Sequence, residues 1–219
     1  MTIKKTLALL VLCILAGTGA NARSFEKGDV VISAAGIVSP LGLTSDWGEF
    51  YIQDQTQNIQ HDAKLGKPGF GGELQAVYFF HPRFAAGISA SDQHFAKDKA
   101  SGWEVNVGTH QKNLMLGGQI FINPESEYKV YLPFSAGWNR SRVSVDFGGT
   151  QHFKYTGFAY RAGIGVMHVY NRHWALGLEA RYNGNQFHDS HYIASNGNRI
   201  HLRHKMNFVS GVLRLNYIL

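Results

Sequence analysis

The chain ends with the stretch Leu213-Arg214-Leu215-Asn216-Tyr217-Ile218-Leu219, in which large apolar residues alternate with mostly polar ones. Side chains of a β-strand point alternately to opposite faces, so positions 213, 215, 217 and 219 would form one apolar stripe. Arg214 and Asn216 would then face the other way. This pattern is typical of a strand that has lipid on one face and a polar lumen on the other.

The other end of the chain has the pattern of a secretory signal peptide. Lys4 and Lys5 precede the apolar run Leu7–Ala16, and Ala20-Asn21-Ala22 supplies small residues for cleavage. We therefore expect residues 1–22 to be a signal peptide and residues 23–219 to be the mature domain. A retained anchor is the alternative, but the apolar run is shorter than the ~20 residues that span a bilayer. From Arg23 onward no apolar run reaches that length, so a membrane residence would require β-strands.

Composition excludes several classes of function. The only cysteine, Cys13, lies in the predicted signal peptide, so thiol catalysis and disulfides are excluded from the mature domain. Without Lys4 and Lys5 the 21 basic residues become 19, which against 15 acidic residues gives a charge of +4. These basic residues are scattered, and no basic tract interleaved with aromatic residues indicates nucleic-acid binding. The 25 glycines and 13% aromatic residues are consistent with a β-protein.

Alternating segments bounded by turn residues predict eight strands. Their expected ranges are Asp29–Val38, Phe70–Phe80, Phe84–Ser91, His110–Ile122, Tyr128–Val145, Tyr155–Tyr170, Trp174–Phe187 and Lys205–Leu219. Three predicted connections are short (81–83, 123–127, 171–173), and four are long (Pro40–Gly69, Asp92–Thr109, Asp146–Lys154, His188–His204). This is the layout of an all-β, eight-stranded antiparallel up-and-down transmembrane barrel, whose N and C termini would both lie in the periplasm.

The parity of charges along the strands supports a polar lumen. In 174–185 the charged residues Glu179 and Arg181 share the odd face, whereas the even face is mostly apolar. A soluble lipocalin-type barrel would have its apolar face inside. The secretory signal and the apolar last strand favour the membrane alternative.

Five inward charges are expected at a similar depth in the barrel. Counted from the periplasmic ends of their strands, these residues are Glu73, Arg161, Glu179, Arg181 and Arg214. The interior of an eight-stranded barrel is just wide enough for side chains to fill it, and buried charges there require partners. We therefore expect a network of ion pairs that plugs the lumen. A gated narrow pore is the functional alternative.

Aromatic residues near the strand ends predict two belts at the membrane interfaces. The expected periplasmic belt comprises Tyr78, Phe80, Phe84, Tyr128, Tyr170, Trp174 and Tyr217, and the outer belt comprises Trp138, Tyr155, Phe158, Tyr182 and Phe208. Two irregularities are also expected: a bulge or an extension above the membrane near Gly108, and an interrupted hydrogen-bond ladder at Pro133, which lacks an N–H group.

These features together resemble the small outer-membrane β-barrel families: the OmpA transmembrane domain, opacity-type adhesins and OmpW-like proteins. The last strand is similar to the assembly signal of such proteins, with Gly211, Leu213, Leu215, Tyr217 and Leu219 in the matching places. The usual final Phe is replaced by Leu219. The resemblance implies outer-membrane lipid, lipopolysaccharide, periplasmic chaperones and the barrel-assembly machinery as partners, and nothing implies a nucleic acid.

The loops contain the candidates for chemistry. Histidine pairs at 188/191 and 201/204 have a spacing that metals can use, but no Cys or carboxylate cluster accompanies them, so we expect neither a metal nor a cofactor. His188 and Ser190 match the His-x-Ser pairing of outer-membrane lipid A deacylases, in which Ser attacks an ester. The acidic residue that follows the Ser in those enzymes has no counterpart here.

The sequence therefore predicts a non-enzymatic, integral outer-membrane barrel whose long loops serve surface interaction, adhesion or envelope integrity. The first loop, Pro40–Gly69, mixes aromatic and acidic residues, a blend suited to a host surface, an extracellular polymer or neighbouring lipopolysaccharide. Two alternatives stay open: a narrow channel for small solutes, as in OmpW-like proteins, and the lipid A esterase.

Overall fold

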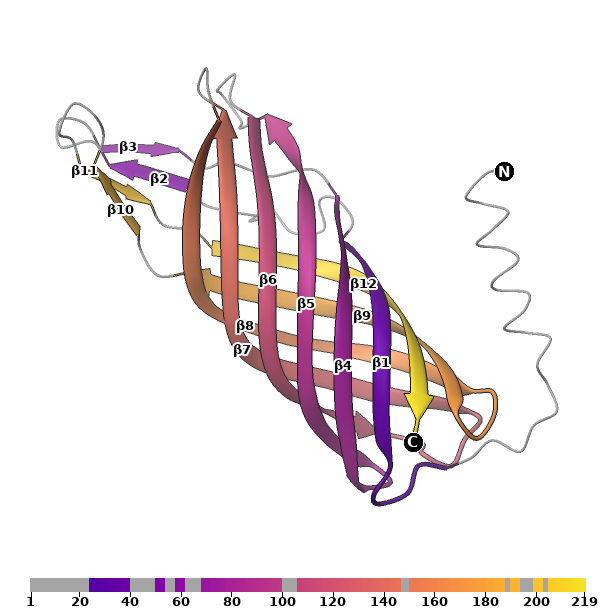
Figure 1. The fold of residues 1–219 in the computed structure, drawn as a ribbon. Coiled ribbons are helices and arrows are strands. Elements are labelled where there is room, and N and C mark those ends of the chain that lie inside the picture. Colours follow the sequence, from indigo (N-terminus) through magenta and orange to yellow (C-terminus); the bar gives the residue numbers. More distant parts are fainter. Residues whose placement is uncertain are drawn as a thin grey trace, which may run out of the picture.

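The chain folds into a closed eight-stranded barrel. The computed structural model describes residues 24–39, 50–53, 58–61, 68–99, 106–146, 150–187, 190–193, 199–202 and 205–219. Within these ranges the antiparallel strand order is β1-β12-β9-β8-β7-β6-β5-β4, and β4 pairs with β1 (Figure 1). The barrel strands are β1 (Val30–Ser39), β4 (Gly69–His81), β5 (Phe84–Lys99), β6 (Asn106–Phe121), β7 (Tyr128–Asp146), β8 (Thr150–Val169), β9 (Trp174–Phe187) and β12 (Lys205–Ile218). The predicted fold class is confirmed.

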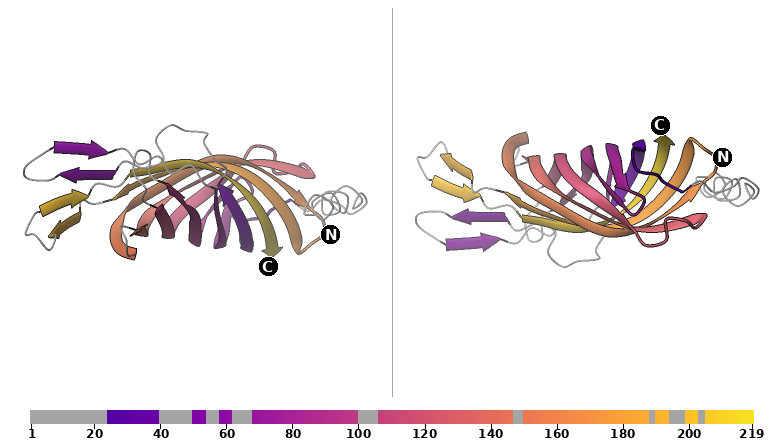
Figure 2. Two further views of the ribbon diagram at one scale, coloured as in Figure 1. Left: turned by 90° about the horizontal axis from the view of Figure 1, so that it is seen from above. Right: turned by 90° about the horizontal axis from the view of Figure 1, so that it is seen from below.

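The two ends of the barrel differ. At one end, called the turn end below, short connections join β4 to β5, β6 to β7 and β8 to β9, as the sequence predicts. Beyond the opposite end, the loop end, lie two hairpins, β2 (Phe50–Gln53) with β3 (Asn58–His61) and β10 (Ser190–Ile193) with β11 (Arg199–Leu202). Figure 2 shows these hairpins next to each other, with β11 against β2.

The prediction of a long loop at Asp92–Thr109 is wrong, because most of this range is β-strand. β5 continues to Lys99 and β6 begins at Asn106, so strand covers all of this range except residues 100–105, which lie outside the described residues. The next predicted loop is also shorter, because β8 begins at Thr150. A strand that extends past the apolar band has no lipid on its outer face, so its sequence loses the alternation by which strands are found.

Both predicted irregularities of the ladders are present. The β5/β6 register shifts between Phe95 and Asp98, opposite the segment that contains Gly108. The β7/β8 ladder has no aligned pair at Leu132 and Pro133 and resumes in the same register at Phe134. Proline therefore interrupts the hydrogen bonding without changing the alignment of the strands.

The barrel has an apolar outer wall and a polar interior over most of its length. Outward side chains on each strand are exposed and largely apolar, and they include Leu74, Ile88, Leu116, Phe134, Ile164, Leu178 and Leu215. Many polar side chains point inward and are buried, among them Glu73, Arg161, Glu179, Arg181, Arg214, Gln111, Asn139 and Asn185. This arrangement is the reverse of a soluble barrel and matches a barrel that is surrounded by hydrocarbon. Among the described residues, no helix is long and apolar enough to cross a bilayer.

Most of the aromatic residues predicted for the two belts are exposed, and two of them are buried. Trp138, Phe158 and Tyr182 are exposed on the outer wall toward the loop end. Tyr155 and Phe208, predicted for the same belt, are wrong, because both side chains lie inside the barrel with 1% exposure. Tyr155 is an odd residue in β8, where even residues face outward, and Phe208 is an even residue in β12, where odd residues face outward. Whether a side chain faces outward therefore depends on the alternation of residues along its strand, and nearness to the end of the strand does not change it.

An apolar cluster that the sequence does not predict fills the turn end of the lumen. Phe25, which precedes β1, stacks on Phe79 with a centroid distance of 4.2 Å and also contacts Phe121 at 5.2 Å. The connecting turn contains Gly28 with φ of 105°, a left-handed conformation that favours glycine. The Gly28 N–H donates to the Phe79 carbonyl at 2.8 Å, and this bond holds the N-terminal segment against β4.

Candidate functional site: the buried ion network of the lumen

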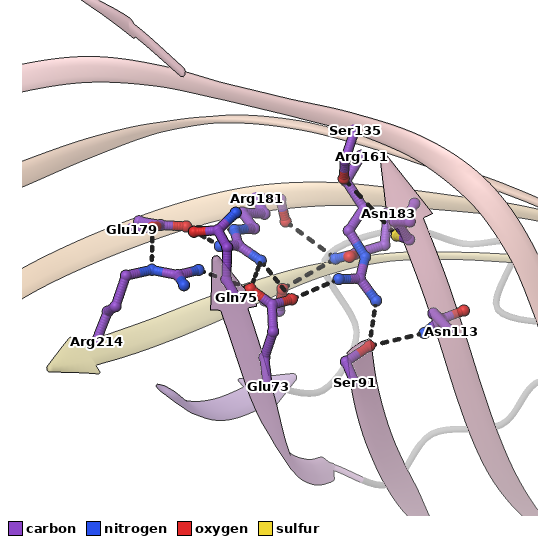
Figure 3. A network of polar contacts seen from close by, with 12 residues as sticks. Glu73, Gln75, Ser91, Asn113, Ser135, Arg161, Glu179, Arg181, Asn183 and Arg214 are labelled. Atoms are coloured by element: carbon purple, nitrogen blue, oxygen red, sulfur yellow. Dashed lines mark hydrogen bonds and ion pairs between the residues drawn. The ribbon is translucent and has the colours of Figure 1, made fainter. Parts of the chain in front are cut away.

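The five charged residues predicted for the lumen lie together in the structure. Glu73 comes from β4, Arg161 from β8, Glu179 and Arg181 from β9, and Arg214 from β12. All five side chains are at most 6% exposed. Figure 3 shows the guanidinium groups of the three arginines pointing toward the carboxylates of Glu73 and Glu179.

Glu73 receives hydrogen bonds from all three guanidinium groups. Arg161 Nη1 donates to Glu73 Oε2 at 2.6 Å, and Arg214 Nη2 donates to Oε1 at 2.7 Å. Arg181 Nη1 shares its contact between the two carboxylate oxygens, at 3.1 and 3.0 Å. A buried carboxylate with this many charged donors is well compensated for the loss of its hydration.

Glu179 is the second acceptor of the network. Arg214 Nε donates to Glu179 Oε1 at 2.8 Å, and the Arg181 guanidinium pairs with Oε2. The Tyr131 hydroxyl from β7 also donates to Oε1, at 2.6 Å. Tyr131 was not predicted as a member, although it is an inward residue of its strand, because nothing in the sequence shows which side chains reach across the lumen.

Small residues in the wall make room for the network. Ala35 of β1 is aligned with Glu73 on one side and with Arg214 on the other, so these two long side chains meet across a methyl group. The Tyr131 ring lies over Gly165, where an added Cβ would be 2.5 Å from the ring Cζ. Glycine at 165 is therefore required by the close approach of an aromatic ring.

The side chains of the network are buried against one another and carry a net positive charge. Three guanidinium groups against two carboxylates leave a formal charge of 3 − 2 = +1 in a buried layer. A cavity beside the network has a volume of ≈ 10 Å³, and its lining includes Gln75, Ser89 and Ser135 together with Glu73, Arg161 and Arg181 of the network. That is about the space of a single water molecule.

A layer of amides and hydroxyls lies next to the ion network, toward the loop end. Arg161 Nη2 donates to Ser91 Oγ at 2.6 Å, and Asn113 Nδ2 donates to the same oxygen at 3.1 Å. Further along, Gln111 and Asn139 each donate to Asn185 Oδ1 at 2.6 Å. This layer was not predicted, although its uncharged polar residues share the inward-facing positions of their strands, which is a signal that the sequence contains.

The other predicted site residues are placed as follows. Gly211, Leu213, Leu215, Tyr217 and Leu219 share the outward face of the last strand and its end, so the predicted assembly signal forms one stripe on the outer wall. His188 lies outside the described residues and Ser190 begins β10, so the described part of the chain does not test the esterase pair. In the described part of the chain, no group of three or more metal-ligating side chains gathers. Residues 1–22 lie outside the described residues.

A closed barrel with an apolar outer wall and a charged lumen defines an integral outer-membrane protein. The chain belongs to the family described as outer membrane protein beta-barrel domain, whose model matches residues 7–207. The protein is accordingly located in the outer membrane.

Solved structures with the same fold include OprG of Pseudomonas aeruginosa, with a TM-score of 0.63 and 12% sequence identity over 92% of this chain and 99% of that chain. Neisserial surface protein A has a TM-score of 0.50 and 16% identity over 88% of this chain and 98% of that chain. Ail, the attachment invasion locus protein of Yersinia pestis, has a TM-score of 0.49 and 14% identity over 89% and 100% of the two chains. A comparison with curated proteins gave no match.

Proposed function

We propose that the protein is a non-enzymatic, non-conducting outer-membrane barrel whose loops at the loop end mediate surface interaction. The observation that carries this proposal is the closed lumen: buried side chains of the ion network, the amide layer and the apolar cluster fill successive levels of the interior. A filled barrel is a rigid support, and binding residues on such supports are found disproportionately in loops. In this orientation the turn end and both termini face the periplasm.

Planar-bilayer recording tests the closed lumen. We expect the folded wild-type protein to give no discrete conductance steps, because the network leaves space for about one water molecule. The Glu179→Ala variant should also give none while its thermal unfolding temperature falls, as expected for a structural plug. Regular conductance steps from the wild-type protein would contradict the proposal and favour the narrow channel.

Deletion of the first loop tests the surface role. Whole cells that express the wild-type protein are compared with cells that express a variant lacking residues 41–67, joined by a short Gly/Ser linker, for adhesion to host-cell matrix and extracellular polymer. We expect the deletion to reduce adhesion while the barrel stays folded, because residues of this loop lie outside the paired barrel strands. Equal adhesion of both strains, with equal amounts of folded barrel, would contradict a surface role for this loop.

A further inference from the structure

The outer wall has a basic patch near the loop end. Lys112 on β6, Arg140 and Arg142 on β7, and Lys154 on β8 all point outward, and His110 on β6 completes the set. The registers align Lys112 with Arg140, and they align His110 with Arg142 and Arg142 with Lys154. The strands concerned are neighbours in the barrel (Figure 1). These five residues, the basic patch, line a recess of ≈ 250 Å³ together with Ser141.

The basic patch lies directly next to the apolar band. One row toward the turn end, the registers align Leu114 with Trp138 and Trp138 with Phe158, and all three side chains are exposed. Trp138 is 74% exposed, and aromatic side chains with this exposure on a membrane barrel mark the interface between hydrocarbon and headgroups. The cations therefore begin where the hydrocarbon ends, at the depth of lipid headgroups.

Within the described residues, a single carboxylate faces the basic patch. Asp92 on β5 pairs with His110 and lies 3.5 Å from Lys112 Nζ. In the described part of the chain, no carboxylate contacts Arg140, Arg142 or Lys154. Four Lys and Arg side chains against one carboxylate leave a formal charge of 4 − 1 = +3, with His94, His110 and His152 as the neighbouring histidines.

We propose that this patch binds the phosphate groups of a phosphorylated glycolipid in the outer leaflet. Guanidinium groups bind phosphate oxygens through paired hydrogen bonds, and two of them lie two residues apart on the same face of β7. A lipid is favoured over a soluble polyanion because the patch faces sideways from the barrel wall and adjoins the apolar residues that would contact acyl chains. The assignment to the outer leaflet rests on the proposed orientation of the barrel.

The test measures lipid binding by the full, folded protein in detergent micelles. The probes are diphosphorylated lipid A, dephosphorylated lipid A, inorganic phosphate and heparin. The variant Arg140→Gln/Arg142→Gln removes two charges of the patch, and Lys27→Gln/Arg83→Gln removes two exposed charges at the turn end as a matched control. We expect the patch variant to bind diphosphorylated lipid A about tenfold more weakly, since each basic residue contributes measurably near an anionic membrane surface. The control variant should bind like the wild type.

Several outcomes would overturn the proposal. They are equal affinity of the patch variant and the wild type, equal affinity for phosphorylated and dephosphorylated lipid A, and patch-dependent binding of heparin without binding of the lipid. Because binding in micelles does not depend on how the barrel is inserted, surface labelling of intact cells is read separately. If labelling places the loop end inside the cell envelope while the lipid still binds, only the leaflet and the proposed orientation are wrong.

Discussion

At the scale of single residues, the number of positive and negative charges in the ion network determines how much each side chain contributes to the stability of the barrel. The network has one more guanidinium group than carboxylates, so loss of a carboxylate and loss of an arginine differ in their consequences. Removal of one partner of a buried pair costs about 3–5 kcal/mol because the remaining charge stays buried without compensation. Glu179 has two arginine partners and one tyrosine partner, and its loss would leave three cations with a single carboxylate.

We therefore predict that Glu179→Gln lowers the free energy of unfolding by about 3–5 kcal/mol. Arg214→Met should cost at least about 1 kcal/mol less, because it leaves two arginines and two carboxylates and so removes the excess charge. Urea unfolding in lipid vesicles, followed by tryptophan fluorescence, gives both values. Glu125→Ala at an exposed turn position should stay within about 0.5 kcal/mol of the wild type. The reverse order of the two variants would contradict this account of the network.

The charged residues of the network were predictable because few charged residues occupy the inward-facing positions of the predicted strands, and these are easily counted. The uncharged partner Tyr131 was not, since an inward hydroxyl gives no indication of the partner across the lumen. Contacts across a barrel depend on strand tilt and stagger, which the alternation pattern alone does not specify.

At the scale of elements, the segment before β1 has a role that its sequence does not show. The Phe25 ring is 2% exposed and packs among inward residues of β4, β6 and β7, so this segment closes the turn end of the lumen. A short segment without periodicity gives no indication that its aromatic residue enters the barrel. The bounds of the barrel strands, by contrast, were predicted to within a few residues except at the loop ends of β5, β6 and β8. The hairpins β2/β3 and β10/β11, which lie within two of the predicted loops, were not predicted.

We predict that Phe25→Ala lowers the free energy of unfolding by about 3–5 kcal/mol, the usual cost of removing a buried phenyl ring. Lys27→Ala, in the same segment but exposed, is the control and should have little effect. Denaturant midpoints of the two variants in the same detergent give the comparison. Equal midpoints would show that the Phe25 ring does not contribute to the stability of the barrel.

At the scale of the whole molecule, the barrel has apolar side chains on its outer wall and polar side chains inside, the reverse of a soluble barrel. The orientation of individual side chains can be measured directly. We predict that a variant with Trp138 as the only tryptophan is strongly quenched by lipids with brominated acyl chains, because this side chain is exposed on the outer wall. A variant with Phe208→Trp as the only tryptophan should resist quenching, since position 208 points into the lumen. Quenching of the second variant to the same extent as the first would contradict the inward orientation.

Among the described ladders of the barrel, the one between the first and last strands has the fewest aligned pairs. β1 and β12 share eight aligned pairs, whereas β7 and β8 share seventeen. The ion pair between Glu73 on β4 and Arg214 on β12 passes over β1, so it bridges this seam from the inside. We expect the Glu73–Arg214 ion pair to stabilise the pairing of the first and last strands. Amide hydrogen exchange in β1 should therefore report the opening of this seam.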